Sequence, residues 1–131
     1  MGRPRSPWAL TLDAGALIAF EQGKPKVRAL VQRAKDLGAE MVIPAGVLAQ
    51  VWRDGSRQTR LAALLSARNV RVEELTAPLA RAIGELCGLR GTNDVIDASV
   101  VMAARRAGSI VVTSDPDDFR QLDPTLNVVR V

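Results

Sequence analysis

Short apolar runs alternate along this chain with longer stretches in which apolar residues recur at helical spacing. Apolar runs between turn signals are typical of buried strands, and the longer period is typical of amphipathic helices. We predict strands at residues 8–13, 40–44, 70–75, 109–115 and 127–131. We predict helices at residues 14–20, 24–38, 45–53, 56–69, 77–91, 94–108 and 117–122.

The ends of two predicted helices carry residues that commonly start or stop a helix. Pro25 lies near the start of helix 24–38, and Gly38 follows its last apolar position. Glycine is favoured there because it adopts the left-handed backbone conformation that often follows the last helical residue. Ser56 is the candidate N-cap of helix 56–69.

Strands alternate with helices along the whole chain, which indicates an α/β fold. We predict a three-layer domain, in which a central parallel sheet of about five strands is flanked by helices on both faces. The 131 residues suffice for one such domain, because a chain of roughly this length buries about two thirds of its unfolded surface. We expect a flexible leader at residues 1–6 and a single domain at residues 7–131.

The composition narrows the chemistry that this chain can perform. It contains no His and no Tyr, and its single cysteine is Cys87. These absences exclude an internal disulfide, His-based general base catalysis and imidazole or Cys-rich zinc sites. A lone cysteine fits a reducing compartment, and no apolar run approaches the ~18 residues of a membrane span. We therefore expect a cytoplasmic protein without a membrane partner.

Acidic residues stand where predicted strands end, although the net charge is +4. Asp13 follows the first strand, Asp115 ends the fourth, and Asp97 lies early in the helix between them. Because ligands bind beyond the carboxyl ends of parallel strands, we expect these three acids to converge. Two like charges ~4 Å apart repel by about 4 kcal/mol at an effective dielectric near 20. A hard cation such as Mg²⁺ or Mn²⁺ would relieve that repulsion.

Three neighbouring acids have alternative roles. Asp94 lies one turn before Asp97 on the same helix face, and it fits an N-cap and a site residue equally well. For Asp117 and Asp118 we favour capping of helix 117–122.

The segments that carry these residues resemble PIN-domain ribonucleases, in particular the VapC-like toxins of bacterial toxin–antitoxin modules. The matching segments are LDAGALIA, IPAGVLAQVWR and DASVVMAARRAGSIVVTSDPDDF, at residues 12–19, 43–53 and 97–119. They occur in order over nearly the whole chain. The resemblance implies a metal-dependent endoribonuclease with an acidic Mg²⁺ or Mn²⁺ site. It also implies a homodimer and a cognate antitoxin that occludes the site.

The resemblance assigns three of the family's four acids to Asp13, Asp97 and Asp115, as metal ligands and catalytic residues. The second acid of the family is usually a Glu, and here the matching residue is Gln50. An amide oxygen can ligate a hard cation, but it carries no charge and is a poor base. We therefore expect a lower metal affinity than with four acids, and Asp94 is the residue that would partly compensate.

The implied chemistry is hydrolysis of RNA by a metal-activated water. Thr113 or Ser114 would orient the water or a carboxylate, although an ordinary strand-end and turn role fits each of them as well. The Gln50 substitution supports an alternative function: a PIN-like domain that binds RNA or a partner protein with weak or absent cleavage.

The basic excess is mostly arginine, with 15 Arg against three Lys, and arginine is the better bidentate ligand for phosphate. Arg53, Arg57 and Arg60 follow the helix after the second strand, and Gly55 interrupts their stripe. We interpret Arg53 as a contact to an RNA phosphate or an antitoxin carboxylate. Arg57 and Arg60 are weaker candidates, because a solvated face explains them. For Trp52 we favour the core or an interface over base stacking.

Overall fold

A computed structural model describes residues 9–131, so the leader expected at 1–6 lies outside the described residues. Five strands run through this part of the chain: β1 (Leu10–Leu12), β2 (Met41–Pro44), β3 (Val70–Glu73), β4 (Ile110–Thr113) and β5 (Val128–Arg130). Seven helices connect or flank them: α1 (Ala14–Glu21), α2 (Pro25–Leu37), α3 (Ala45–Val51), α4 (Thr59–Leu65), α5 (Ala77–Arg90), α6 (Val95–Ala107) and α7 (Pro116–Leu122).

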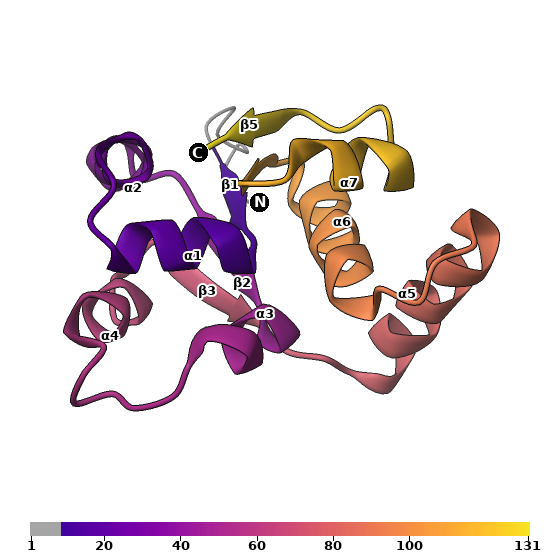
Figure 1. The fold of residues 1–131 in the computed structure, drawn as a ribbon, viewed down its shortest axis with the longest axis horizontal. Coiled ribbons are helices and arrows are strands. Elements are labelled where there is room, and N and C mark those ends of the chain that lie inside the picture. Colours follow the sequence, from indigo (N-terminus) through magenta and orange to yellow (C-terminus); the bar gives the residue numbers. More distant parts are fainter. Residues whose placement is uncertain (1–8) are drawn as a thin grey trace, which may run out of the picture.

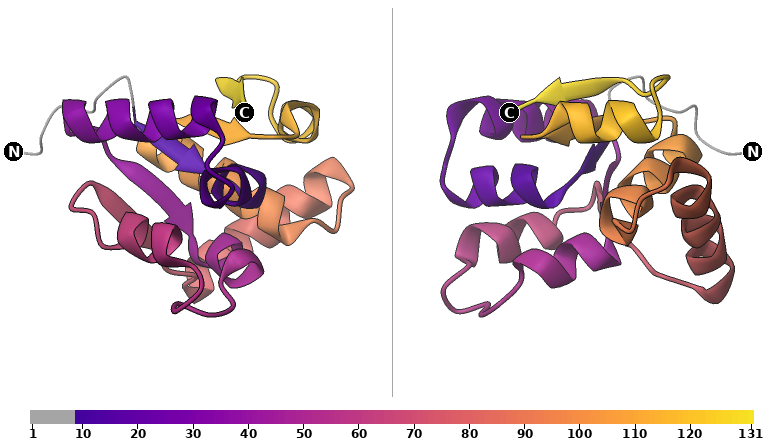
Figure 2. Two further views of the ribbon diagram at one scale, coloured as in Figure 1. Left: turned by 60° about the vertical axis from the view of Figure 1, so that its left-hand side comes forward. Right: turned by 45° about the vertical axis from the view of Figure 1, so that its right-hand side comes forward.

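The strands form one parallel sheet in the order β3-β2-β1-β4-β5. Figure 1 shows α1, α2 and α4 on one side of the sheet and α5 and α6 on the other, and the two further views in Figure 2 agree. The predicted α/β class, with a central parallel sheet of about five strands flanked by helices, is confirmed.

The strand order reverses at the centre of the sheet. From β1 the chain first adds β2 and β3 on one side, and it later adds β4 and β5 on the other. Neighbouring strands whose connections leave in opposite directions create a crevice at their carboxyl ends, where α/β proteins bind ligands. Here that crevice lies beyond β1 and β4, which pair directly.

The three central strands β1, β2 and β4 are almost entirely buried, as expected of a sheet covered on both faces. The largest fully buried side chains include Leu12, Ile43, Val100 and Phe119, which come from the sheet and from α6 and α7. Thr11 is the polar exception on β1, and its hydroxyl is hydrogen-bonded to the Ser109 hydroxyl. No helix within residues 9–131 is long and apolar enough to cross a membrane.

The helix predicted at 56–69 is shorter in the structure, where α4 spans seven residues. Ser56 does not cap it, so that prediction is wrong. Both the backbone N–H and the hydroxyl of Ser56 donate to Asp54 Oδ1, at 3.0 and 2.7 Å, in a turn before the helix. Gln58 occupies the N-cap position and makes no side-chain capping bond. Ser56 therefore belongs to the turn at Asp54, two residues before the N-cap position of α4.

The capping role predicted for Asp117 and Asp118 is also wrong. Helix α7 begins at Pro116, so Asp115 occupies the N-cap position and the two acids lie in the first turn. Asp117 pairs with Arg120 at 3.1 Å. Of the two roles that fitted Asp94 equally well, the N-cap is the one found at the start of α6.

Candidate active site

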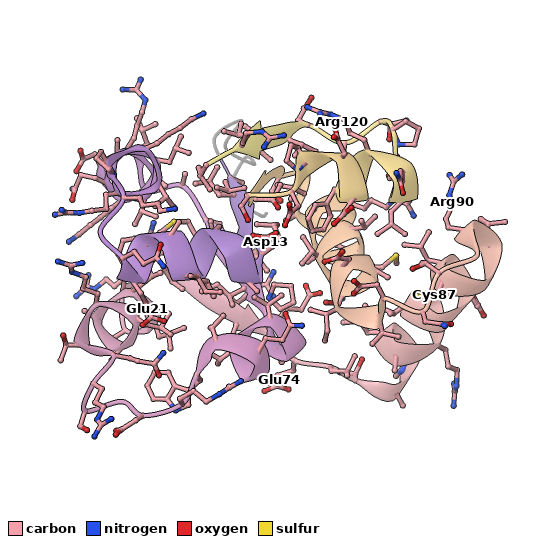
Figure 3. The ribbon with its side chains drawn as sticks, in the orientation of Figure 1. Asp13, Glu21, Glu74, Cys87, Arg90 and Arg120 are labelled. Carbon is pink, nitrogen blue, oxygen red and sulfur yellow. The ribbon has the colours of Figure 1, made fainter. Side chains whose placement is uncertain are left out.

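Asp13 lies at the carboxyl end of β1 and is the N-cap of α1. One carboxylate oxygen accepts a hydrogen bond from the Ala16 N–H at 2.8 Å, and the other accepts one from the Thr113 hydroxyl. The residue is buried, and Figure 3 shows it near the centre of the molecule, at the start of α1. Burial raises the pKa of Asp13 above its ordinary value, and the charge of Asp115 adds to the rise, against the two hydrogen bonds.

Thr113 is the last residue of β4 and is fully buried. Its hydroxyl donates to Asp13, and its oxygen accepts a hydrogen bond from the Asp115 N–H at 2.9 Å. Thr113 therefore joins the carboxyl ends of β1 and β4 and orients the Asp13 carboxylate. Ser114, the next residue, packs against α1: a Cβ added at Gly15 would lie 2.1 Å from the Ser114 hydroxyl oxygen.

Asp97 lies in the first turn of α6 and is about half-buried. Its backbone N–H donates to the Asp94 carboxylate at 2.9 Å, so the two acids lie side by side. Burial raises the pKa of Asp97 to about 7, and the neighbouring Asp94 carboxylate is the next cause. Asp118 and Asp13 raise it further by their negative charge. The Asp97 carboxyl therefore changes between its protonated and deprotonated forms near neutral pH.

A polar cavity of about 330 Å³ opens beside Asp97. Its wall consists of Arg90, Gly91, Thr92, Asp94, Asp97, Asp118, Gln121 and Leu122. Asp118 is the residue that the sequence analysis missed as a site candidate. Its position three residues after Asp115, at the start of a helix, is the signal that would have indicated it, since residues with this spacing share one helix face.

Gln50 is exposed in α3, and its side-chain amide makes no hydrogen bond to any of residues 9–131. Its helix packs between α1 and α6, whose starts carry Asp13 and Asp97. The approach to α6 is close, because a Cβ added at Gly46 would lie 2.6 Å from the Ile96 side chain. The helix of Gln50 thus borders the acidic crevice, but the Gln50 amide is not hydrogen-bonded to the acids.

The three arginines predicted as contacts are engaged within the chain. The Arg53 guanidinium donates to two backbone carbonyl groups at the end of α3, at 3.1 and 2.7 Å. Arg57 pairs with Asp54 at 3.7 Å, and Arg60 donates to a backbone carbonyl of α1 at 2.9 Å. Of the two placements that we favoured for Trp52, the core is wrong because the residue is 37% exposed, and the interface remains a prediction.

The donors at this crevice are carboxylate and hydroxyl oxygens, which suit a hard cation such as Mg²⁺ or Mn²⁺. Within residues 9–131, no group of three His, Cys, Asp or Glu side chains is close enough to enclose a metal ion. Asp13 is nevertheless near enough to Asp97 and Asp115 for their charges to interact. The separation of these carboxylates fits a hydrated cation, because Mg²⁺ keeps several waters and needs only one or two carboxylates.

The family model of the PIN domain matches residues 10–123 of this sequence. This chain belongs to the PIN-domain family. The acids that border the crevice of this PIN domain all lie within the matched residues. A comparison with curated proteins finds no match to the sequence.

Solved structures show the same fold at low sequence identity. VapBC2 from Rickettsia felis, bound to a DNA fragment from its promoter, aligns with a TM-score of 0.70 at 16% identity, over 94% of this chain and 98% of that chain. VapC20 from Mycobacterium tuberculosis, a sarcin-ricin loop cleaving toxin, aligns with a TM-score of 0.55 at 19% identity, over 78% and 86%. PAE2754 from Pyrobaculum aerophilum aligns with a TM-score of 0.58 at 20% identity, over 94% and 92%.

Proposed function

We propose that this PIN domain is a metal-dependent endoribonuclease that acts as the toxin of a toxin–antitoxin module. The observation that carries the proposal is the set of carboxylates at the reversal of strand order, where Asp13 interacts by charge with both Asp97 and Asp115. Clustered acids with raised pKa values are typical of functional sites. The similar fold of a toxin that cleaves the sarcin-ricin loop supports the same reaction class.

In this proposal Asp13, Asp97 and Asp115 would hold Mg²⁺ or Mn²⁺, directly or through water. When bound, the cation supplies an activated water and neutralises charge on the scissile phosphate. The Thr113 hydroxyl keeps the Asp13 carboxylate in place. Asp97 would hold the cation as the deprotonated carboxylate, because metal ligands must be deprotonated. Asp94, whose carboxylate accepts from the Asp97 N–H, lies beside it and would partly compensate for the missing second acid.

The partners in this proposal are an RNA substrate, a cognate antitoxin and a second copy of the chain. The fold similarity to the VapBC2 complex supports an antitoxin that covers the crevice. The candidate contacts to RNA or antitoxin remain Arg53, Arg57 and Arg60. Each would have to exchange its bonds within the chain for bonds to that partner. Two exposed leucines, Leu75 just before α5 and Leu89 near its end, at 58% and 79%, support a homodimer contact near this helix.

One observation favours a second candidate function, a PIN domain that binds RNA or protein without cleaving it. Gln50 replaces the usual second acid, and its side-chain amide is not hydrogen-bonded to the carboxylates. In that case the remaining acids would bind metal weakly and the fold would serve as a binding module.

Cleavage of an RNA panel distinguishes the two functions. Purified, antitoxin-free protein is incubated with structured and single-stranded RNAs in Mn²⁺, Mg²⁺ or EDTA, beside Asp97→Asn. We expect the parent to cleave only with metal and the variant not to cleave. An inactive parent that also binds no metal would contradict the nuclease function and support the binding function, and Gln50→Glu would then be expected to restore cleavage.

A further inference from the structure

The cavity beside Asp97 is lined on one side by a positively charged residue, Arg90. Arg90 is the last residue of α5, and Gly91 after it adopts a left-handed conformation with φ of +67° that turns the chain toward α6. The remaining walls come from the start of α6 and from α7. Figure 3 shows Arg90 at the outer end of α5, far along the helix from the sheet. The cavity is therefore open to solvent on the side where Arg90 stands.

The Arg90 guanidinium makes no hydrogen bond or ion pair with any of residues 9–131, although Arg90 lines the same cavity as Asp94, Asp97 and Asp118. Arginine usually pairs with a carboxylate when the geometry allows it, since bidentate pairs are the stronger ones. This arginine thus keeps its donors available beside a group of acids. In that respect it differs from Arg53, which donates to carbonyl groups of its own helix.

The size and lining of the cavity suit one nucleotide. A volume of about 330 Å³ falls at the lower end of the roughly 300–1,000 Å³ of small-ligand sites. Gln121 offers an amide that both donates and accepts, and the Thr92 hydroxyl accepts from the Asp94 N–H and has a proton left to donate. Leu122 adds an apolar surface. Acids and amides of this kind recognise the edge of an unstacked base.

We infer that Arg90 binds the RNA phosphate next to the scissile one and so seats the adjacent nucleotide in this cavity. This inference rests on the proposed ribonuclease function, because it takes Asp13 and Asp97 as the place of cleavage. An arginine at this position offsets the repulsion between the acidic wall and the RNA backbone. It would then act on substrate binding, and not on the chemical step.

The test compares three variants on a single-stranded RNA that the parent cleaves. Arg90→Ala removes the guanidinium, and Arg90→Lys keeps the charge without the bidentate geometry. Arg81→Ala is the matched control, since Arg81 is exposed on the same helix and lies outside the cavity. The readouts are KM and kcat at several salt concentrations and the melting temperature of each variant.

For Arg90→Ala we expect KM to rise about tenfold or more, as for a lost charged hydrogen bond, while kcat stays close to that of the parent. The slope of log KM against log salt should fall by about 0.7, the value for one phosphate contact on a single strand. Arg90→Lys should keep most of that slope and recover part of the affinity. Arg81→Ala should match the parent in every readout.

Two results would overturn the inference while leaving the ribonuclease function in place. One is an Arg90→Ala variant whose KM and salt slope equal those of Arg81→Ala. The other is a loss confined to kcat with an unchanged salt slope. If the parent cleaves no RNA, the ribonuclease function fails, and with it the placement of Arg90 beside a scissile phosphate. Fluorescence anisotropy then tests the phosphate contact alone: weaker RNA binding by Arg90→Ala than by Arg81→Ala would retain that contact, and equal binding would overturn it.

Discussion

The Asp13 carboxylate is held from two sides, by the Ala16 N–H and by the Thr113 hydroxyl. The position of Asp13 after a strand follows from the apolar pattern of the sequence, and so does that of Asp115. The bond from Thr113 does not follow from that pattern, because 100 residues separate the two partners. The same holds for Asp118, whose approach to Asp97 depends on how α7 packs against α6.

Thr113→Val should weaken metal binding and cleavage. The change keeps the shape of a fully buried side chain but removes the donor to Asp13 and the acceptor for the Asp115 N–H. We expect a loss of about 1–3 kcal/mol in the free energy of unfolding, since buried polar groups lose their partner. Thr11→Val is the control, because it breaks an equally buried hydroxyl bond away from the crevice. Equal Mn²⁺ affinity in both variants would exclude an orienting role for Thr113.

The raised pKa of Asp97 makes the metal-free stability depend on pH. The folded chain holds the proton up to about pH 7, whereas an ordinary Asp has a pKa of 3.8. The folded state therefore binds more protons than the unfolded state between these values, and stability falls as pH rises across that window. Urea unfolding in EDTA at pH 5 and pH 8 measures the loss. Asp97→Asn should show a smaller loss, and an identical pH dependence would contradict the assigned cause.

At the scale of the elements, helix ends were predictable where glycine stops them. Gly38, Gly91 and Gly108 all adopt the left-handed conformation after α2, α5 and α6. The start of α4 was not predictable from Ser56, because Asp54 binds that serine in a turn. A glycine ends a helix because of its own backbone freedom, which can be read from one position. A capping serine can instead hydrogen-bond to another neighbour, and the sequence pattern does not show which one.

Gly15→Ala should destabilise the domain and reduce cleavage, although alanine is the better helix former by about 1 kcal/mol. The added Cβ would meet Ser114 at 2.1 Å and push α1 away from the end of β4. We expect a net loss of about 1–3 kcal/mol in unfolding free energy, as for other overpacked contacts. Chemical denaturation measures this loss.

Two further variants control for helix propensity. Gly84→Ala lies in α5, where an added Cβ meets nothing within 4 Å, so it should be neutral or stabilising. The double variant Gly15→Ala with Ser114→Gly should recover stability, because it removes the atoms that the new methyl group meets. A Gly15→Ala variant as stable as Gly84→Ala would show that α1 and the Ser114 turn are not closely fitted.

At the scale of the whole molecule, the strand order brings together acids that lie far apart in the sequence. The alternating pattern predicted a parallel sheet and hence one edge for Asp13 and Asp115, and the structure has that sheet. The pattern does not determine the distances between the acids, which depend on how α6 and α7 pack. It also does not show that Gln50 would remain outside the hydrogen bonds of the crevice.

The chain has a net charge of +4, whereas the crevice is acidic. The local charges at the crevice therefore decide whether this PIN domain binds metal. Gln50→Glu should add a fourth acid at little cost in stability, because the Gln50 side chain is exposed and makes no hydrogen bond to the described residues. Thermal denaturation without metal checks that cost. A strongly destabilised variant would mean that the side chain at position 50 lies closer to the carboxylates than Gln50 does in the structure.

Calorimetric titration with Mn²⁺ at pH 8 tests the cation site most directly, on the parent, Asp97→Asn and Gln50→Glu. We predict measurable binding to the parent, with tighter binding to Gln50→Glu and a strong loss in Asp97→Asn. Binding to Asp97→Asn that equals binding to the parent, or no binding to either the parent or Gln50→Glu, would contradict a metal-dependent site at these carboxylates.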